Sequence, residues 1–84
     1  MTLRTWIASA EERKGLRKRF PEGCRVQLEW MDELHAPPRG TKGTVIGVDD
    51  LGTVHVRWDN GSTLGVVYGV DECRRISDDE ADEV

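Results

Sequence analysis

A β-hairpin is predicted by RWDNGSTLGVVYGVD, residues 57–71, the most informative segment of the chain. Its Asn60-Gly61 pair separates an alternating run of apolar and polar residues from a second run rich in valine. Such a pair is the strongest short-range hairpin signal, and it predicts a two-residue type I′ turn with positive φ at both positions. We therefore expect strands over TVHVRW, residues 53–58, and STLGVVY, residues 62–68.

The segments before this hairpin predict two more strands. In CRVQLEW, residues 24–30, alternation places Cys24, Val26, Leu28 and Trp30 on one face. In TVHVRW the inward residues are Val54, Val56 and Trp58. GTVIGV, residues 43–48, is also expected to be a strand, but its inward register stays open because Val45 opposes Ile46 and Val48. Its glycines indicate bulges or a sharp bend.

Short connections and one long one complete the pattern. Residues 49–52 form a hairpin loop with Gly52 in the left-handed position, and a short fifth strand is expected near residues 72–76. The longest connection, MDELHAPPRGT at 31–41, contains two prolines that exclude a regular strand. The sequence therefore predicts a mainly β domain over residues 20–76, a small five-stranded SH3-like barrel whose closure would remove exposed sheet edges.

The two ends of the chain carry opposite charge. Residues 1–19 hold six basic and two acidic side chains, and we expect a basic amphipathic helix that starts at a Ser9–Glu12 capping box. Leu16 and Phe20 form a thin apolar stripe, which predicts a helix lying on the barrel or on a partner. Residues 77–84, SDDEADEV, hold five acids and no base, and we expect this tail to be disordered.

Size and composition exclude several classes of protein. The 84 residues predict one domain, without an apolar run of membrane-spanning length and without a secretory signal, so we expect a cytoplasmic protein that does not bind a membrane. Cys24 and Cys73 form no CxxC pair with each other, and His35 and His55 form no HxxxH pair, so no metal or other cofactor is expected. Aspartates at 49, 50, 59 and 71 fit turns, Asp59 by capping backbone amides, and we expect no enzymatic activity.

The predicted contact surface joins the long loop to two aromatic residues. Long loops in compact barrels often carry function, and aromatic residues are common in peptide-binding grooves. The expected protein-binding residues, which would contact a protein partner or a second copy of the chain, are Trp30, Met31, Asp32, Leu34, His35 and Tyr68. Trp58 is expected in the core because it shares a face with Val54 and Val56.

Two alternatives remain open at this point. The basic helix would bind nucleic acid if its cations met phosphates along one side, and these cations are Arg13, Lys14, Arg17, Lys18 and Arg19. A small-ligand cleft between the subunits of a homo-oligomer is the other alternative. Steep salt dependence would favour nucleic acid, whereas a thermal shift with a metabolite would favour a cleft.

The middle of the chain, residues 20–76, contains the motifs FPxGxRVxL, a Met-Asp pair, APPxGTxGTV, GVDDxG and WDNGSxL. With these motifs it resembles a family of short bacterial and phage proteins known as domain of unknown function four-three-one-four. The resemblance implies no activity and no catalytic residues. Members are often met in Gram-positive bacteria and their mobile elements, so the resemblance implies an accessory or host-modulating role.

Overall fold

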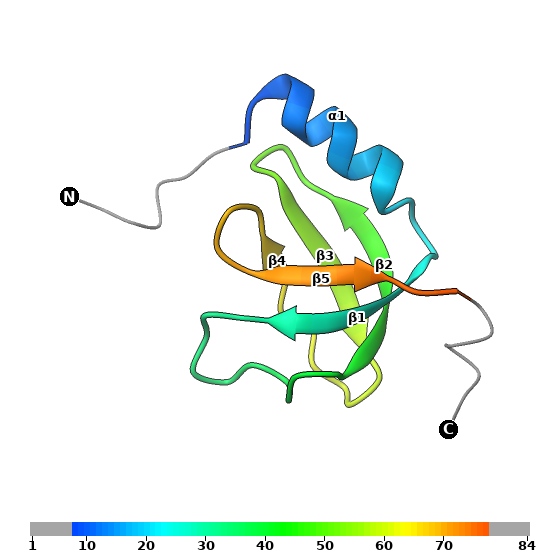
Figure 1. Cartoon of the computed structure of the whole chain (residues 1–84), viewed down its shortest axis with the longest axis vertical. Helices are drawn as coiled ribbons and strands as arrows, with labels where there is room; N and C mark the ends of the chain where they lie inside the picture. The colour runs from blue at the N-terminus through cyan, green and yellow to red at the C-terminus, as the bar shows by residue number, and fades with distance from the viewer. Residues whose placement is uncertain (1–7, 78–84) are drawn as a thin grey trace.

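The computed structural model describes residues 8–77, so the predicted disorder of the acidic tail lies almost wholly outside the described residues. The elements are α1 (Ala10–Arg19), β1 (Arg25–Trp30), β2 (Lys42–Val48), β3 (Thr53–Trp58), β4 (Val66–Val67) and β5 (Glu72–Arg75) (Figure 1). The five strands form one antiparallel sheet in the order β4-β3-β2-β1-β5. The predicted mainly β class is confirmed. In the described part of the chain, no helix has the length and apolarity to cross a membrane.

A β-bulge settles the open register of β2. The pairing with β3 shifts between Val45 and Gly47, so that Val45 pairs with Val56 and Val48 with Val54. Val45 is buried, whereas Ile46, the extra residue, is 45% exposed. The bulge lets valines at odd and even positions face the same side of one strand.

A second bulge brings Trp30 to the surface, against the alternation of its strand but in agreement with its expected role as a contact residue. Val26 and Leu28 are buried as expected, but the pairing of β1 with β5 shifts between Leu28 and Trp30. The extra residue, Glu29, breaks the alternation, and the Trp30 side chain is 59% exposed. Trp58 has no such irregularity before it and lies buried in the core, as predicted.

The hairpin after β3 is built differently from the predicted type I′ turn. The Gly61 amide donates to the Trp58 carbonyl at 2.9 Å, and the Trp58 amide donates to the Ser62 carbonyl at 2.8 Å. Asn60 does not have positive φ, whereas Gly61 has φ +95°. This is a type I turn followed by a left-handed glycine, a three-residue loop. The predicted strand over 62–68 shrinks to Val66–Val67.

The hairpin between β2 and β3 uses the same construction. The Gly52 amide donates to the Asp49 carbonyl at 3.1 Å, the Asp49 amide donates to the Thr53 carbonyl at 3.0 Å, and Gly52 has φ +89°. The predicted left-handed Gly52 is confirmed. Both connections thus place a glycine where a Cβ would be strained.

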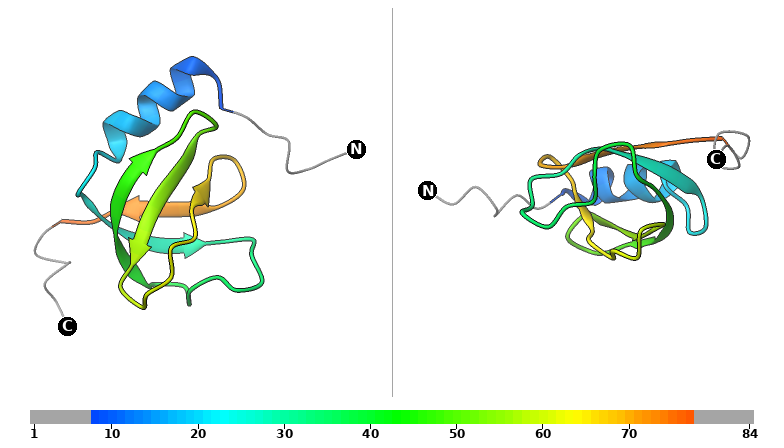
Figure 2. Two further views of the ribbon diagram at one scale, coloured as in Figure 1. Left: turned by 180° about the vertical axis from the view of Figure 1, so that it is seen from behind. Right: turned by 90° about the horizontal axis from the view of Figure 1, so that it is seen from below.

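The helix is part of the core. Its predicted capping box is present, since the Glu12 amide donates to Ser9 Oγ at 3.1 Å and the Ser9 amide donates to Glu12 Oε1 at 2.8 Å. Leu16 and Phe20 are buried in the same cluster as the sheet residues Val26, Val54 and Trp58. Figure 2, seen from below, shows α1 between β5 and the β2–β3 hairpin. Closure of the sheet into an SH3-like barrel stays a prediction.

Candidate functional site

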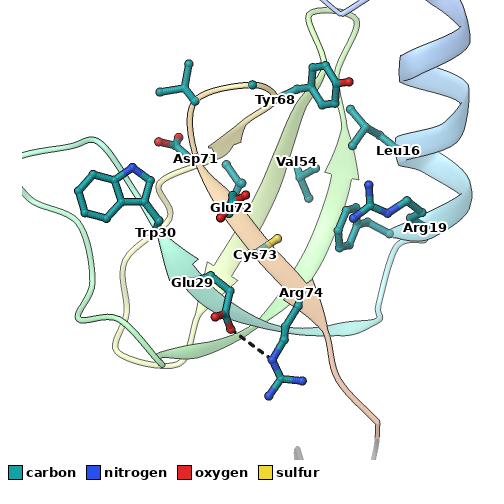
Figure 3. A pocket seen from close by; sticks show the side chains of 14 residues that line it. Leu16, Arg19, Glu29, Trp30, Val54, Tyr68, Asp71, Glu72, Cys73 and Arg74 are labelled. Atoms are coloured by element: carbon teal, nitrogen blue, oxygen red, sulfur yellow. Dashed lines mark hydrogen bonds and ion pairs between the residues drawn. The ribbon is translucent and has the colours of Figure 1, made fainter.

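A groove of about 720 Å³ opens between α1, β5 and the turn that joins β4 to β5 (Figure 3). Its apolar lining comes from four elements: Leu16 and Phe20 at α1 and its end, Val54 on β3, Val66 on β4 and Cys73 on β5. Its other lining residues are Arg19, Glu29, Trp30, Tyr68, Gly69, Val70, Asp71, Glu72 and Arg74. The volume lies in the range of protein binding pockets.

Tyr68 is held in place by the helix. Its hydroxyl donates to Glu12 Oε2 at 3.0 Å, so the residue that closes the capping box also positions the aromatic wall of the groove. The hydrogen bond to Glu12, together with the negative charge of that carboxylate, raises the pKa of Tyr68. Hydrogen bonds from the Ser9 amide and the Tyr68 hydroxyl lower the pKa of Glu12. With both pKa shifts, Tyr68 is a neutral phenol and Glu12 a carboxylate at neutral pH, and the hydrogen bond between them is retained.

Asp71 organises the backbone at one end of the groove. Its carboxylate is buried and accepts the amides of Asp32 at 2.8 Å and Val67 at 2.9 Å, one on each oxygen. A buried carboxylate needs such partners, because burying it without them would cost several kcal/mol, on the order of the penalty for any desolvated charge. Asp71 therefore ties the start of the long loop to the β4–β5 turn, which is a positioning role.

Cys73 contributes an uncharged wall. Burial raises the pKa of its thiol to about 12, with Cys24 and Glu29 adding to the shift and Arg19 opposing it. At neutral pH the thiol stays protonated, and a protonated thiol is a poor nucleophile and a poor metal ligand. Burial also raises the pKa of Cys24. In residues 8–77, no group of three His, Cys, Asp or Glu side chains is placed to hold a metal ion.

The charges of the groove are separated along β5. Figure 3 shows Asp71, Glu72 and Trp30 toward the N-terminal end of the strand, and Arg19 and Arg74 toward the other end. Arg74 Nε donates to Glu29 Oε2 at 3.2 Å, and the Arg19 guanidinium lies 4.9 Å from the centre of the Phe20 ring. Both arginines are exposed at the rim of the groove while making these contacts.

The structure brings together only part of the predicted contact surface. Trp30 and Tyr68 both line the groove. Met31 was expected to contact a partner, but it is 7% exposed and belongs to the core, because the chain turns inward directly after the β1 bulge. Asp32 does not line the groove, but its backbone amide donates to the groove residue Asp71. Leu34 and His35 are exposed on the loop, Leu34 to 90%, but neither lines the groove.

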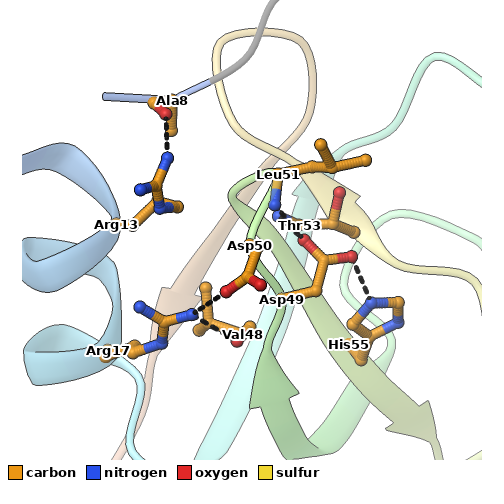
Figure 4. Close-up of polar contacts among 9 residues, drawn as sticks. All are labelled: Ala8, Arg13, Arg17, Val48, Asp49, Asp50, Leu51, Thr53 and His55. Atoms are coloured by element: carbon orange, nitrogen blue, oxygen red, sulfur yellow. Dashed lines mark hydrogen bonds and ion pairs between the residues drawn. The ribbon is translucent and has the colours of Figure 1, made fainter. Parts of the chain in front are cut away.

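The basic side chains of α1 do not share one side of the helix. Arg13 Nη1 donates to the Ala8 carbonyl at 2.8 Å, and Arg17 Nη2 donates to the Val48 carbonyl and to Asp50 Oδ1, both at 3.2 Å (Figure 4). Arg19 lines the groove on another side of the helix. Lys14 and Lys18, four residues apart, are exposed and lie away from Leu16. The five cations predicted to bind phosphates along one side of the helix therefore lie on three different sides of it.

The aspartates of the turns have structural partners. Asp49 Oδ1 accepts the amides of Leu51 at 2.9 Å and Thr53 at 3.0 Å, and its Oδ2 lies 2.8 Å from His55 Nε2 (Figure 4). Burial would raise the pKa of Asp49, but these hydrogen bonds outweigh it and the pKa is lowered.

Asp59 differs from its predicted role. Rather than capping backbone amides, it accepts from Arg25 Nη1 at 2.9 Å across the β1–β2–β3 sheet, and this bond lowers its pKa. The amide-capping role in that turn belongs to Asn60, whose Oδ1 accepts from the Ser62 amide at 3.0 Å.

Sequence reasoning missed Arg19, Asp71 and Cys73 as groove residues. Arg19 was grouped with the other cations of the helix, although Leu16 and Phe20 set the buried side and helical geometry places Arg19 next to it. Asp71, directly before a short strand, carried the signal of a turn residue, and no sequence pattern reveals which amides it accepts. Cys73 is inward by alternation with Glu72 and Arg74, which was a usable signal.

Comparison with known proteins identifies the family. Searches of curated proteins and of solved structures return no match. A family model described as Domain of unknown function (DUF4314) matches residues 9–76. The match begins at the N-cap of α1, so it includes the helix that the sequence resemblance had left outside. Since the model covers well over half of the sequence, the chain belongs to this family of unknown function.

Proposed function

We propose that this protein is a non-enzymatic binding protein that holds another polypeptide in the groove between α1 and β5. The observation that carries the proposal is an open groove with an apolar floor and two aromatic side chains, Trp30 and Tyr68, on its walls. Trp30 is exposed and Tyr68 is half-buried, and tryptophan and tyrosine are among the residue types that dominate binding energy in protein interfaces.

The polar groups of the groove favour a polypeptide over a small polar ligand. Asp71 is engaged by two backbone amides, Tyr68 by Glu12, and Glu29 by Arg74. These bonds shape the walls and reduce the number of groups left to orient a small molecule, which needs a few well-placed polar contacts. A peptide backbone brings its own donors and acceptors and fits such a surface.

The setting of this role rests on the sequence resemblance. The family resembled is met in bacteria, phages and mobile elements, so we place the binding protein in a bacterial cytoplasm as an accessory protein of such an element. Binding of nucleic acid through α1 is the competing function. It has less support, because Arg13 and Arg17 are bonded to Ala8, Val48 and Asp50.

Panning of a displayed random-peptide library against the full chain tests the proposal. We expect enriched peptides whose affinity falls at least about tenfold with Trp30→Ala, the loss typical of an interface hot spot. Leu34→Ala is the matched control, since this exposed apolar residue lies outside the groove. Peptides that bind both variants equally, or a library that yields no enriched peptide, would contradict the proposal.

The competing function has its own signature. Binding of DNA or RNA would weaken steeply with salt and would fall when Lys14 and Lys18 are replaced by glutamate. The groove proposal predicts that these two substitutions leave peptide affinity unchanged.

A further inference from the structure

The free edge of β5 offers backbone hydrogen-bonding groups to the groove. β5 is the last strand of the sheet in the described part of the chain, with β1 on one side only. The Ile76 amide donates to the Arg25 carbonyl at 3.0 Å, and the register continues with Gln27 opposite Arg74. In an antiparallel pair, hydrogen-bonded and non-hydrogen-bonded positions alternate. The N–H and C=O groups of Cys73 and Arg75 therefore point away from β1.

This edge lies next to the apolar floor. In both Figure 1 and the left view of Figure 2, β5 runs between β1 and α1, and Cys73 lines the groove together with Leu16 and Val66. Natural proteins usually block, twist or cover an exposed strand edge, because such an edge pairs readily with another chain. Here an apolar groove accompanies the edge, a combination typical of domains that bind a peptide by adding a strand.

We propose that the groove binds one extended peptide as an added strand, antiparallel to β5, with hydrogen bonds to Cys73 and Arg75. This inference rests on the proposed function and specifies how the groove would be used. Because α1 and Tyr68 form the far wall, the occupant is a single extended segment rather than the edge of a second sheet. Alternate side chains of the peptide would face the partly buried lining residues Tyr68, Val70 and Cys73, and the others would face solvent.

The charges on β5 set the chemistry of that peptide. The exposed side chains are acidic at the start of the strand, at Glu72, and basic at its end, at Arg74 and Arg75, with Arg19 of α1 on the basic side. An antiparallel peptide lays its N-terminal half beside Arg75 and its C-terminal half beside Glu72. Cross-strand pairs of opposite charge are stabilising and pairs of like charge are destabilising. The peptide that fits therefore has acidic residues first, alternating apolar residues in the middle and basic residues last.

Two synthetic peptides of identical composition test this inference. Each is about eight residues long, enough for one strand and its flanks, with capped ends and alternating valine and threonine in the middle. One begins with two glutamates and ends with two lysines, and the other begins with the lysines. Fluorescence anisotropy with the full chain should show tighter binding of the acid-first peptide, by about fivefold for two cross-strand charge pairs.

A charge-swapped protein provides the decisive control. In the double variant Glu72→Lys with Arg75→Glu, both changes lie at exposed positions, so the fold should be retained. We expect this variant to reverse the preference and bind the lysine-first peptide more tightly, a result that misfolding cannot produce. Equal affinity of the two peptides for the wild-type chain, or an unchanged preference in the variant, would overturn the inference while leaving groove binding intact. If neither peptide binds, strand addition with this chemistry is wrong, and the panning result alone decides the proposed function.

Discussion

Gly43 is a strand residue at which the structure leaves no room for a side chain. It lies on β2 between its sheet partners Val26 and Trp58. A Cβ there would come within 2.6 Å of Val56 Cγ1, 2.8 Å of Trp58 Cε3 and 2.9 Å of the Arg57 carbonyl oxygen. We expect Gly43→Ala to lower the free energy of unfolding by about 1–3 kcal/mol, the usual cost of overpacking a core. Urea unfolding measures this loss.

Gly15 is the matched control for that substitution. It lies in the exposed interior of α1, and a Cβ there meets no atom within 4 Å. Gly15→Ala should raise the free energy of unfolding by about 1 kcal/mol through helix propensity. Equal effects of the two alanines, in either direction, would contradict the packing described for Gly43.

Asp49 makes stability sensitive to acid. Its hydrogen bonds to Thr53, His55 and Leu51 hold its pKa below the ordinary value in the folded chain. A carboxylate with a lowered folded pKa contributes stability above its unfolded pKa, about 4, and this contribution is lost as pH falls through the folded value. Asp49→Asn should therefore reduce the loss of stability in urea titrations between about pH 5 and pH 2. An unchanged acid slope would show that the carboxylate is not selectively stabilised.

The tryptophans show what alternation can and cannot predict. Trp58 follows an uninterrupted alternating strand, and its burial was predicted correctly. Trp30 follows the same pattern in the sequence, yet the bulge at Glu29 moves it to the surface. A bulge depends on the register with the partner strand, and that register is not written in the local pattern. Alternation alone therefore gave the wrong face for Trp30, whereas its expected place on the contact surface agrees with its exposure and its position in the groove.

At the scale of the secondary-structure elements, the type of turn after β3 can be tested. If the loop after β3 is a type I turn followed by a left-handed glycine, only Gly61 needs positive φ. We expect Gly61→Ala to cost about 1–2 kcal/mol of unfolding free energy, whereas Asn60→Ser should cost a few tenths. A large penalty for Asn60→Ser would instead support the type I′ turn that the Asn-Gly pair predicted. Thermal unfolding of the two variants, compared with the wild type, distinguishes the turns.

The helix is the element whose importance the sequence understated. Its short apolar stripe predicted a peripheral position, but Leu16 is 5% exposed and lies in the core cluster. We expect Leu16→Ala to cost about 2–5 kcal/mol, as for other buried leucines. Leu51→Ala, at an exposed hairpin position, should change stability by less than about 0.5 kcal/mol. Similar small effects of both substitutions in urea unfolding would mean that α1 does not pack as described.

At the scale of the whole molecule, the sheet was predictable and the groove was not. Strands such as Thr53–Trp58 follow from local alternation, and the two glycine hairpins follow from their turn residues. The groove is assembled from α1, β1, β3, β4 and β5, whose residues are far apart in the sequence. No periodic pattern reveals that Leu16, Val54 and Cys73 share one wall, because that depends on how the helix packs across the open side of the sheet.

The function proposed for the whole molecule requires that a peptide pairs with the free edge of β5. Amide hydrogen exchange measured by NMR, with and without the acid-first peptide, examines it at single residues. The account predicts that the peptide slows exchange of the Cys73 and Arg75 amides, which point away from β1, and leaves the Arg74 amide, already bonded to β1, unchanged. Protection that appears elsewhere while Cys73 and Arg75 exchange as before would contradict it.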